Sequence, residues 1–79
     1  VAPVHIVIIP KVSGLRSPRD LENNPELAGQ LVSVAAKIAS QENLDSGYRL
    51  IMNCGEHAGQ SVPHVHLHIL GGGTLGPLG

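Results

Sequence analysis

The chain has 79 residues, with five lysine and arginine residues, six acidic residues and a formal net charge of -1. This length allows one domain at most, and a single core of this size rarely supplies more than about 3 to 5 kcal/mol of stability. The charge gives no basic field, which argues against binding to the backbone of long nucleic acids by counterion release. No stretch approaches the roughly 20 apolar residues that a membrane-spanning helix needs.

The single cysteine, Cys54, cannot form a disulfide within the chain, so a reducing cytoplasm is the expected setting. The chain begins at Val1 and enters an apolar run almost at once. We therefore expect a fragment whose N-terminal part is missing. Its core is thin because the chain has one tyrosine and no phenylalanine or tryptophan.

The first part of the chain predicts a strand and a connection. Residues 4–10 are rich in β-branched side chains and end at a proline, which favours a strand with both faces largely covered. Residues 11–24 contain several turn-forming residues, including glycine and proline, and predict a surface connection. Within it, the sequence Ser-Pro-Arg-Asp at 17–20 could cap one short helical turn.

A helix and a second strand are expected next. Asn24 has the character of an N-cap, Pro25 takes the first helical position, and apolar residues follow at helical spacing. This pattern predicts an amphipathic helix that ends near Asn43. Residues 48–53 predict a strand, and residues 54–61 contain two glycines and predict a loop.

Residues 62–70 are expected to form the last strand, which Gly71, Gly72 and Gly73 end. Residues 71–79 are predicted to be a flexible tail. The elements together indicate an α+β fold, in which an antiparallel sheet is crossed by one main helix.

The most informative stretch is the run at 64–70, where histidine and aliphatic residues alternate. Successive side chains of an extended chain point to opposite faces. One face therefore carries His64, His66 and His68, and the other carries Val65, Leu67 and Ile69. Imidazole can act as nucleophile, base or acid near neutral pH, so the chemistry is expected here.

A metal site and a solvated sheet face are the alternatives for this run. At about 3.3 Å per residue, His64 and His68 stand roughly 13 Å apart, which is more than two ligands of one ion can span. No CxxC, HExxH or acidic pair lies nearby, so neither a metal nor a cofactor is expected. A solvated face explains one or two histidines but not their strict alternation. Catalysis uses all three, because a reacting imidazole needs neighbours that fix its tautomer and handle the leaving group's proton.

Small and polar residues precede the run and suit a phosphoryl group. They supply an amide, a hydroxyl and flexible backbone N–H groups: Asn53, Gly55, Gly59, Gln60 and Ser61. His5 is a core residue unless its strand lies beside the histidine strand.

The sequence His-Val-His-Leu-His-Ile-Leu at 64–70 resembles the HφHφHφφ signature of the histidine triad (HIT) superfamily. The resemblance extends over residues 2–11, 47–53 and 59–72. Residues 1–79 are thus similar to the C-terminal two thirds of a single HIT domain of the Hint branch. That branch hydrolyses purine nucleoside phosphoramidates and aminoacyl adenylates, and the resemblance further implies a homodimer with one site per subunit.

The resemblance also implies roles for individual residues. His66 would attack the α-phosphate of a purine nucleotide substrate of the AMP or GMP type and form a nucleotidyl-histidine, which water then hydrolyses. His68 would sit beside the leaving group, while His64 and His5 would form a supporting relay. The residues that would hold the substrate phosphate are Asn53, Gly59, Gln60 and Ser61.

Residue 63 departs from the Hint pattern. It is Pro63, where the Hint branch commonly has an aromatic residue, and Ser-Val-Pro-His is closer to the Fhit branch, which cleaves dinucleoside polyphosphates. The Gly71-Gly72 continuation favours Hint. Two alternatives therefore stay open: a Fhit-like hydrolase, and a non-catalytic nucleotide-binding or interaction module.

Overall fold

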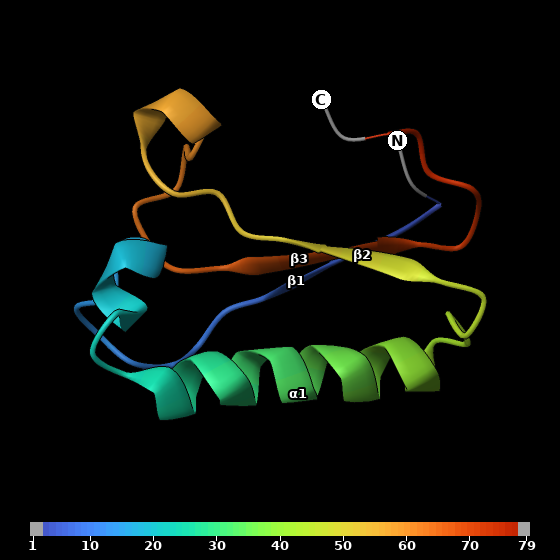
Figure 1. Cartoon of the computed structure of the whole chain (residues 1–79), viewed down its shortest axis with the longest axis horizontal. Helices are drawn as coiled ribbons and strands as arrows, with labels where there is room; N and C mark the ends of the chain where they lie inside the picture. The colour runs from blue at the N-terminus through green and yellow to red at the C-terminus, as the bar shows by residue number, and fades with distance from the viewer. Residues whose placement is uncertain (1–2, 78–79) are drawn as a thin grey trace.

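A computed structural model describes residues 3–77 of the chain. In chain order its elements are β1 (Val4–Ile8), the short 3₁₀ helix η1 (Pro18–Leu21), α1 (Pro25–Gln41), β2 (Tyr48–Ile51), the short 3₁₀ helix η2 (Glu56–Ala58) and β3 (Leu67–Gly71). The strands form one antiparallel sheet, and α1 runs along one of its faces (Figure 1). The orange turn of η2 stands on the other side of the sheet. The α+β fold expected from the sequence is confirmed.

The strand that comes last in sequence lies in the centre of the sheet. The order of strands in the sheet is β1-β3-β2, and β3 is antiparallel to both neighbours. Val7 of β1 and Ile51 of β2 both pair with His68 of β3. Residues that pair directly share a face of the sheet. His68 therefore has a neighbour on each side.

Burial alternates along the central strand as the sequence predicts. The side chains of β3 that face α1 are buried, whereas His68 and Leu70 on the other face are half-buried. The core between sheet and helix consists of Leu21, Leu31, Ala35, Ala39, Leu44, Val65, Leu67 and Ile69. The apolar side chains of the core and the histidine on the open face thus belong to the same strand, β3.

The helix begins where the capping signal places it. The Asn24 side-chain oxygen accepts a hydrogen bond from the Leu27 backbone N–H at 3.2 Å, and Pro25 occupies the first helical position. Leu31, Ala35 and Ala39 repeat every four residues and are buried against the sheet. The helix ends at Gln41, close to the predicted end.

Two predicted strands are shorter in the structure. The first ends at Ile8 rather than at residue 10, and the second ends at Ile51 rather than at residue 53. Pro10 has no N–H to offer a ladder, which limits the first strand.

The last strand begins at Leu67 rather than at residue 62. Pro63 lacks an N–H, and the Val65 N–H donates to the Leu15 carbonyl at 3.0 Å. The alternation of sides nevertheless starts earlier, since Val65 is fully buried while His64 and His66 are half-buried.

The predicted tail begins one residue later than expected. Gly71 is buried and belongs to β3, where it pairs with Val4 and Tyr48. Beyond it, the Arg49 guanidinium donates to the Gly76 carbonyl at 2.6 Å. Residues 78–79 of the tail lie outside the described residues, and its flexibility stays a prediction.

Among residues 3–77, no helix combines the length and the apolar character that crossing a membrane requires.

Replacing Asn24 by alanine removes the cap of α1 and is expected to lower the free energy of unfolding by about 1 kcal/mol. Urea denaturation of the full-length protein measures this loss. The matched control is Asn23→Ala, because Asn23 is exposed and precedes the cap. Equal losses in the two variants would show that Asn24 does not cap the helix.

Candidate active site

Three imidazole rings meet on the face of the sheet that α1 leaves open. Nε2 of His5 and Nδ1 of His68 lie 2.8 Å apart, and the centres of these rings are 5.0 Å apart. The His66 ring meets the His68 ring edge-on, with centres 4.9 Å apart and planes at 76°. His5 thus joins the site, as expected if its strand lies beside β3.

The register of the sheet explains why His5 reaches this cluster. β1 pairs with β3 so that His5 lies opposite Leu70 and Val7 lies opposite His68. Residues two apart on a strand share a face, so His5 and His68 are diagonal neighbours on the open face. The pairing of β2 with β3 ends at Ile51 and His68, so Asn53 lies two residues beyond the ladder.

The His66 ring is oriented by a backbone group. Its Nδ1 atom lies 2.8 Å from the carbonyl oxygen of His64. A carbonyl oxygen only accepts hydrogen bonds, so Nδ1 must carry the proton and donate it. In a neutral ring the lone pair then resides on Nε2, which leaves Nε2 as the nucleophilic atom. The contact therefore selects one tautomer of His66.

His64 is placed differently from the sequence expectation. Its Nε2 atom bonds the Pro10 carbonyl at 3.1 Å, so the imidazole is anchored to the segment after β1. Its contribution to His66 is made by its backbone carbonyl. In this structure a peptide carbonyl bonds the His66 ring, and the His5 ring lies within hydrogen-bond distance of His68. A relay of the His64 and His5 imidazoles stays a prediction.

The environment of His68 lowers the pKa of its imidazole below the usual 6.5. Burial is the main cause, because it penalises the charged form. The neighbouring His66 and His5 add to the effect, since positive charge on either ring repels a proton on His68. His68 therefore stays neutral to a lower pH than a free imidazole.

The loop between β2 and the histidine run closes on itself. The Gly59 N–H donates to the Glu56 carbonyl at 3.0 Å, and the Gln60 N–H donates to the Gly55 carbonyl at 3.1 Å. Gly59 adopts φ 80°, a left-handed conformation that favours glycine. These two amides are bonded within the turn in this structure, and their binding to phosphate stays a prediction. Ser61 is exposed beyond it.

Gln60 is also bonded within the protein rather than open to a ligand. Its Oε1 accepts the Gly55 N–H at 2.8 Å. Its Nε2 donates to the Arg16 carbonyl at 2.6 Å and to the Val62 carbonyl at 3.0 Å. Both amide protons are therefore used within the protein in this structure. A contact of Gln60 with the substrate phosphate stays a prediction.

Sequence reasoning missed the segment before η1, which packs beside this loop. A shallow cavity of about 380 Å³ separates the two and is lined by Arg16, Ser17, Gly55, Glu56, Gln60, Ser61 and Pro63. A hydrogen bond with the Ser17 side chain lowers the pKa of the Cys54 thiol, and Arg19 adds to this shift. The capping signal at 17–20 was visible in the sequence. No periodic pattern indicated that this segment packs beside the loop.

Among residues 3–77, no group of three histidine, cysteine or acidic side chains gathers closely enough to hold a metal ion. A site that works without metal stays a prediction.

The lowered pKa of His68 is testable through its neighbour. Replacing His5 by alanine removes one source of repulsion and part of the cover, so the pKa of His68 should rise toward 6.5. NMR titration of the imidazole protons measures it. His57→Ala is the matched control, because His57 is exposed in η2 and should leave the pKa of His68 unchanged. A wild-type His68 that titrates at or above 6.5 would contradict this account.

Sequence comparison finds relatives over nearly the whole chain. The family model described as HIT domain matches residues 1–75. The chain is 49% identical over 79 residues to a protein of Escherichia coli strain K12 named purine nucleoside phosphoramidase, covering 98% of this chain and 66% of that protein. It is 47% identical over 75 residues to a protein of Zea mays named 14 kDa zinc-binding protein, covering 90% of this chain and 57% of that protein. The chain thus spans less than two thirds of the length of these curated relatives.

Solved structures share the fold. A histidine triad protein from Clostridium difficile superimposes with a TM-score of 0.91 at 37% identity, covering 100% of this chain and 70% of that one. A HIT family hydrolase from Clostridium thermocellum gives a TM-score of 0.88 at 42% identity, covering 98% of this chain and 68% of that one. The resemblance inferred from the histidine run is confirmed, and the chain belongs to the HIT domain family.

Proposed function

We propose that this protein is a nucleotidyl hydrolase, which cleaves purine nucleoside phosphoramidates or aminoacyl adenylates at the α-phosphate through a covalent nucleotidyl-histidine. The observation that carries the proposal is the bond between Nδ1 of His66 and the His64 carbonyl, which leaves the Nε2 lone pair for attack. The Escherichia coli relative, named purine nucleoside phosphoramidase, supports this class of substrate.

In the first step, Nε2 of His66 attacks the α-phosphorus. With an aminoacyl adenylate, the leaving atom is a carboxylate oxygen, which departs with the electron pair and needs no proton. With a phosphoramidate, a bond forms between the His66 nitrogen and phosphorus, and the bond from phosphorus to the leaving amine breaks with its electron pair on the amine nitrogen. That nitrogen takes a proton from the imidazolium form of His68. The lowered pKa of His68 makes this imidazolium a stronger acid than a free one.

In the second step, neutral His68 accepts a proton from water, whose oxygen attacks the phosphorus. The bond between His66 and phosphorus breaks, which releases the nucleoside monophosphate and restores neutral His66. His5, at 2.8 Å from His68, orients the ring that transfers the protons. Asn53 and Ser61 are the side chains that we propose to hold the phosphate oxygens.

A Fhit-like dinucleoside polyphosphate hydrolase is the second candidate, because Pro63 stands before the first histidine of the run. Product analysis separates the two, since only this candidate releases a nucleotide as its leaving group. A non-catalytic nucleotide-binding module would bind a mononucleotide without a burst of product. The homodimer, the cytoplasmic setting and the absence of membrane and long nucleic acid partners stay predictions.

Rapid acid quench of the full-length protein with a labelled adenosine phosphoramidate should trap an acid-labile adduct on the peptide that contains His66. His66→Ala should lose both the adduct and turnover, because it removes the ring whose Nδ1 proton is held by the His64 carbonyl and whose Nε2 carries the lone pair. The matched control is His57→Ala, which removes an exposed histidine and should retain both.

An adduct that persists in His66→Ala but disappears in His68→Ala would overturn the assignment of the nucleophile. Absence of any adduct in a wild-type protein that binds the mononucleotide would favour the non-catalytic module.

A further inference from the structure

An acidic side chain before α1 holds two successive peptide groups. Oδ2 of Asp20 accepts the Arg16 N–H at 2.8 Å and the Ser17 N–H at 3.3 Å. A carboxylate that accepts backbone N–H groups forms charge-assisted bonds, which are stronger than neutral ones. Asp20 thereby fixes the orientation of the carbonyl groups of the same peptide units, those of Leu15 and Arg16.

The first of these carbonyls leads to the nucleophile. The Leu15 carbonyl accepts the Val65 N–H at 3.0 Å. That N–H belongs to the same peptide group as the His64 carbonyl, which accepts the proton on Nδ1 of His66 at 2.8 Å. Two peptide groups therefore connect the Asp20 carboxylate to the reacting ring by three consecutive hydrogen bonds.

The second carbonyl leads to the loop. The Arg16 carbonyl accepts from Nε2 of Gln60 at 2.6 Å, and Gln60 in turn bonds Gly55 and Val62. This second chain of contacts continues from the Val62 carbonyl to the His64 N–H at 2.8 Å, but it includes no bond to the His66 ring. The two chains can therefore be tested separately.

Hydrogen-bonded peptide groups polarise one another, so a negative charge at one end strengthens each acceptor along the chain. Asp20 makes the Leu15 carbonyl bind Val65 more firmly, and this in turn makes the His64 carbonyl a stronger acceptor for His66. Asp20 is exposed, so solvent screens its direct field at the ring. Its influence is carried by the hydrogen bonds themselves.

We propose that Asp20 is a positioning residue for the reaction, which acts on His66 through the peptide groups 15–16 and 64–65 and favours the tautomer with the proton on Nδ1. The proposal rests on the proposed function for its effect on rate, whereas its effect on the tautomer of His66 is independent of any substrate.

Asp20→Asn is the critical variant, because it keeps the shape and an acceptor oxygen while removing the charge. The turnover number should fall on the order of fivefold, since a bond to a charged group contributes more than a neutral one. The KM should stay within about twofold, because Asp20 acts on the reacting ring rather than on substrate binding. Asp20→Ala should lower the turnover number further.

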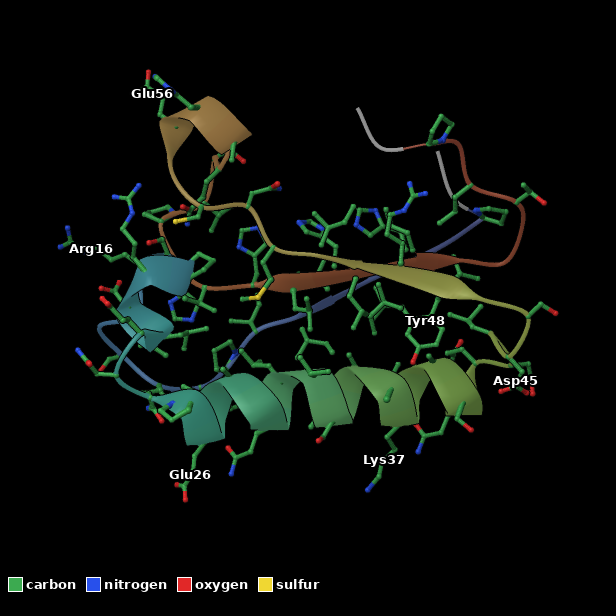
Figure 2. The ribbon with its side chains drawn as sticks, in the orientation of Figure 1. Arg16, Glu26, Lys37, Asp45, Tyr48 and Glu56 are labelled. Atoms are coloured by element: carbon green, nitrogen blue, oxygen red, sulfur yellow. The ribbon has the colours of Figure 1, made fainter. Side chains whose placement is uncertain are left out.

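The second readout is the pair of ring ¹⁵N chemical shifts of His66 in the free full-length protein. In Asp20→Asn these shifts should move toward an even mixture of the two tautomers. Asp45→Asn is the matched control, because Asp45 is exposed and Figure 2 shows it at the opposite end of the molecule from Arg16. Gln60→Met breaks the chain of contacts to the loop, and it should lower turnover without moving the His66 shifts.

Unchanged His66 shifts in Asp20→Asn would overturn the proposal, and so would an equal change in Gln60→Met, which would indicate a general loosening of the site. A wild-type protein without turnover would overturn the proposed function instead, while the ring shifts would still decide the role of Asp20.

Discussion

The hydrogen bond from Nδ1 of His66 to the His64 carbonyl is the contact on which the site depends. It joins two residues of one short segment, so only the local conformation of the chain has to be correct for it to form. By placing the proton on Nδ1, it decides which nitrogen carries the lone pair. The other imidazoles then act around an already oriented nucleophile, with His5 and His68 paired at 2.8 Å beside it.

The fold keeps that segment in place from its opposite face. Val65, Leu67 and Ile69 are buried under α1, and each buried aliphatic side chain contributes about 1.5–3 kcal/mol. A shift of one residue in the pairing register of this strand would expose all three side chains and would point the histidines toward the core. The burial of one face therefore enforces the exposure of the imidazoles on the other. Pairing of β3 on both edges adds the ladder bonds that hold its register.

Much of this arrangement could be predicted from local patterns. Alternation at 64–70 predicted the two faces, and Asn24 predicted the start of the helix. The late start of β3 was also visible in principle, because Pro63 cannot donate to a ladder. No periodicity marks contacts between segments far apart in sequence, and the place of His5 in the site was expected only from the family resemblance. Gln60 is the clearest case of such a contact, because nothing in the sequence indicates the bond of its amide to the Arg16 carbonyl.

Neutron diffraction from deuterium-exchanged crystals of the full-length protein near neutral pH tests the central claim most directly, because it locates the proton on the His66 ring. The account predicts nuclear density for deuterium on Nδ1, directed at the His64 carbonyl oxygen, and none on Nε2. Deuterium on Nε2 with a bare Nδ1 would contradict it, because the carbonyl would then face a lone pair and the ring would have no nucleophilic nitrogen to present to phosphorus.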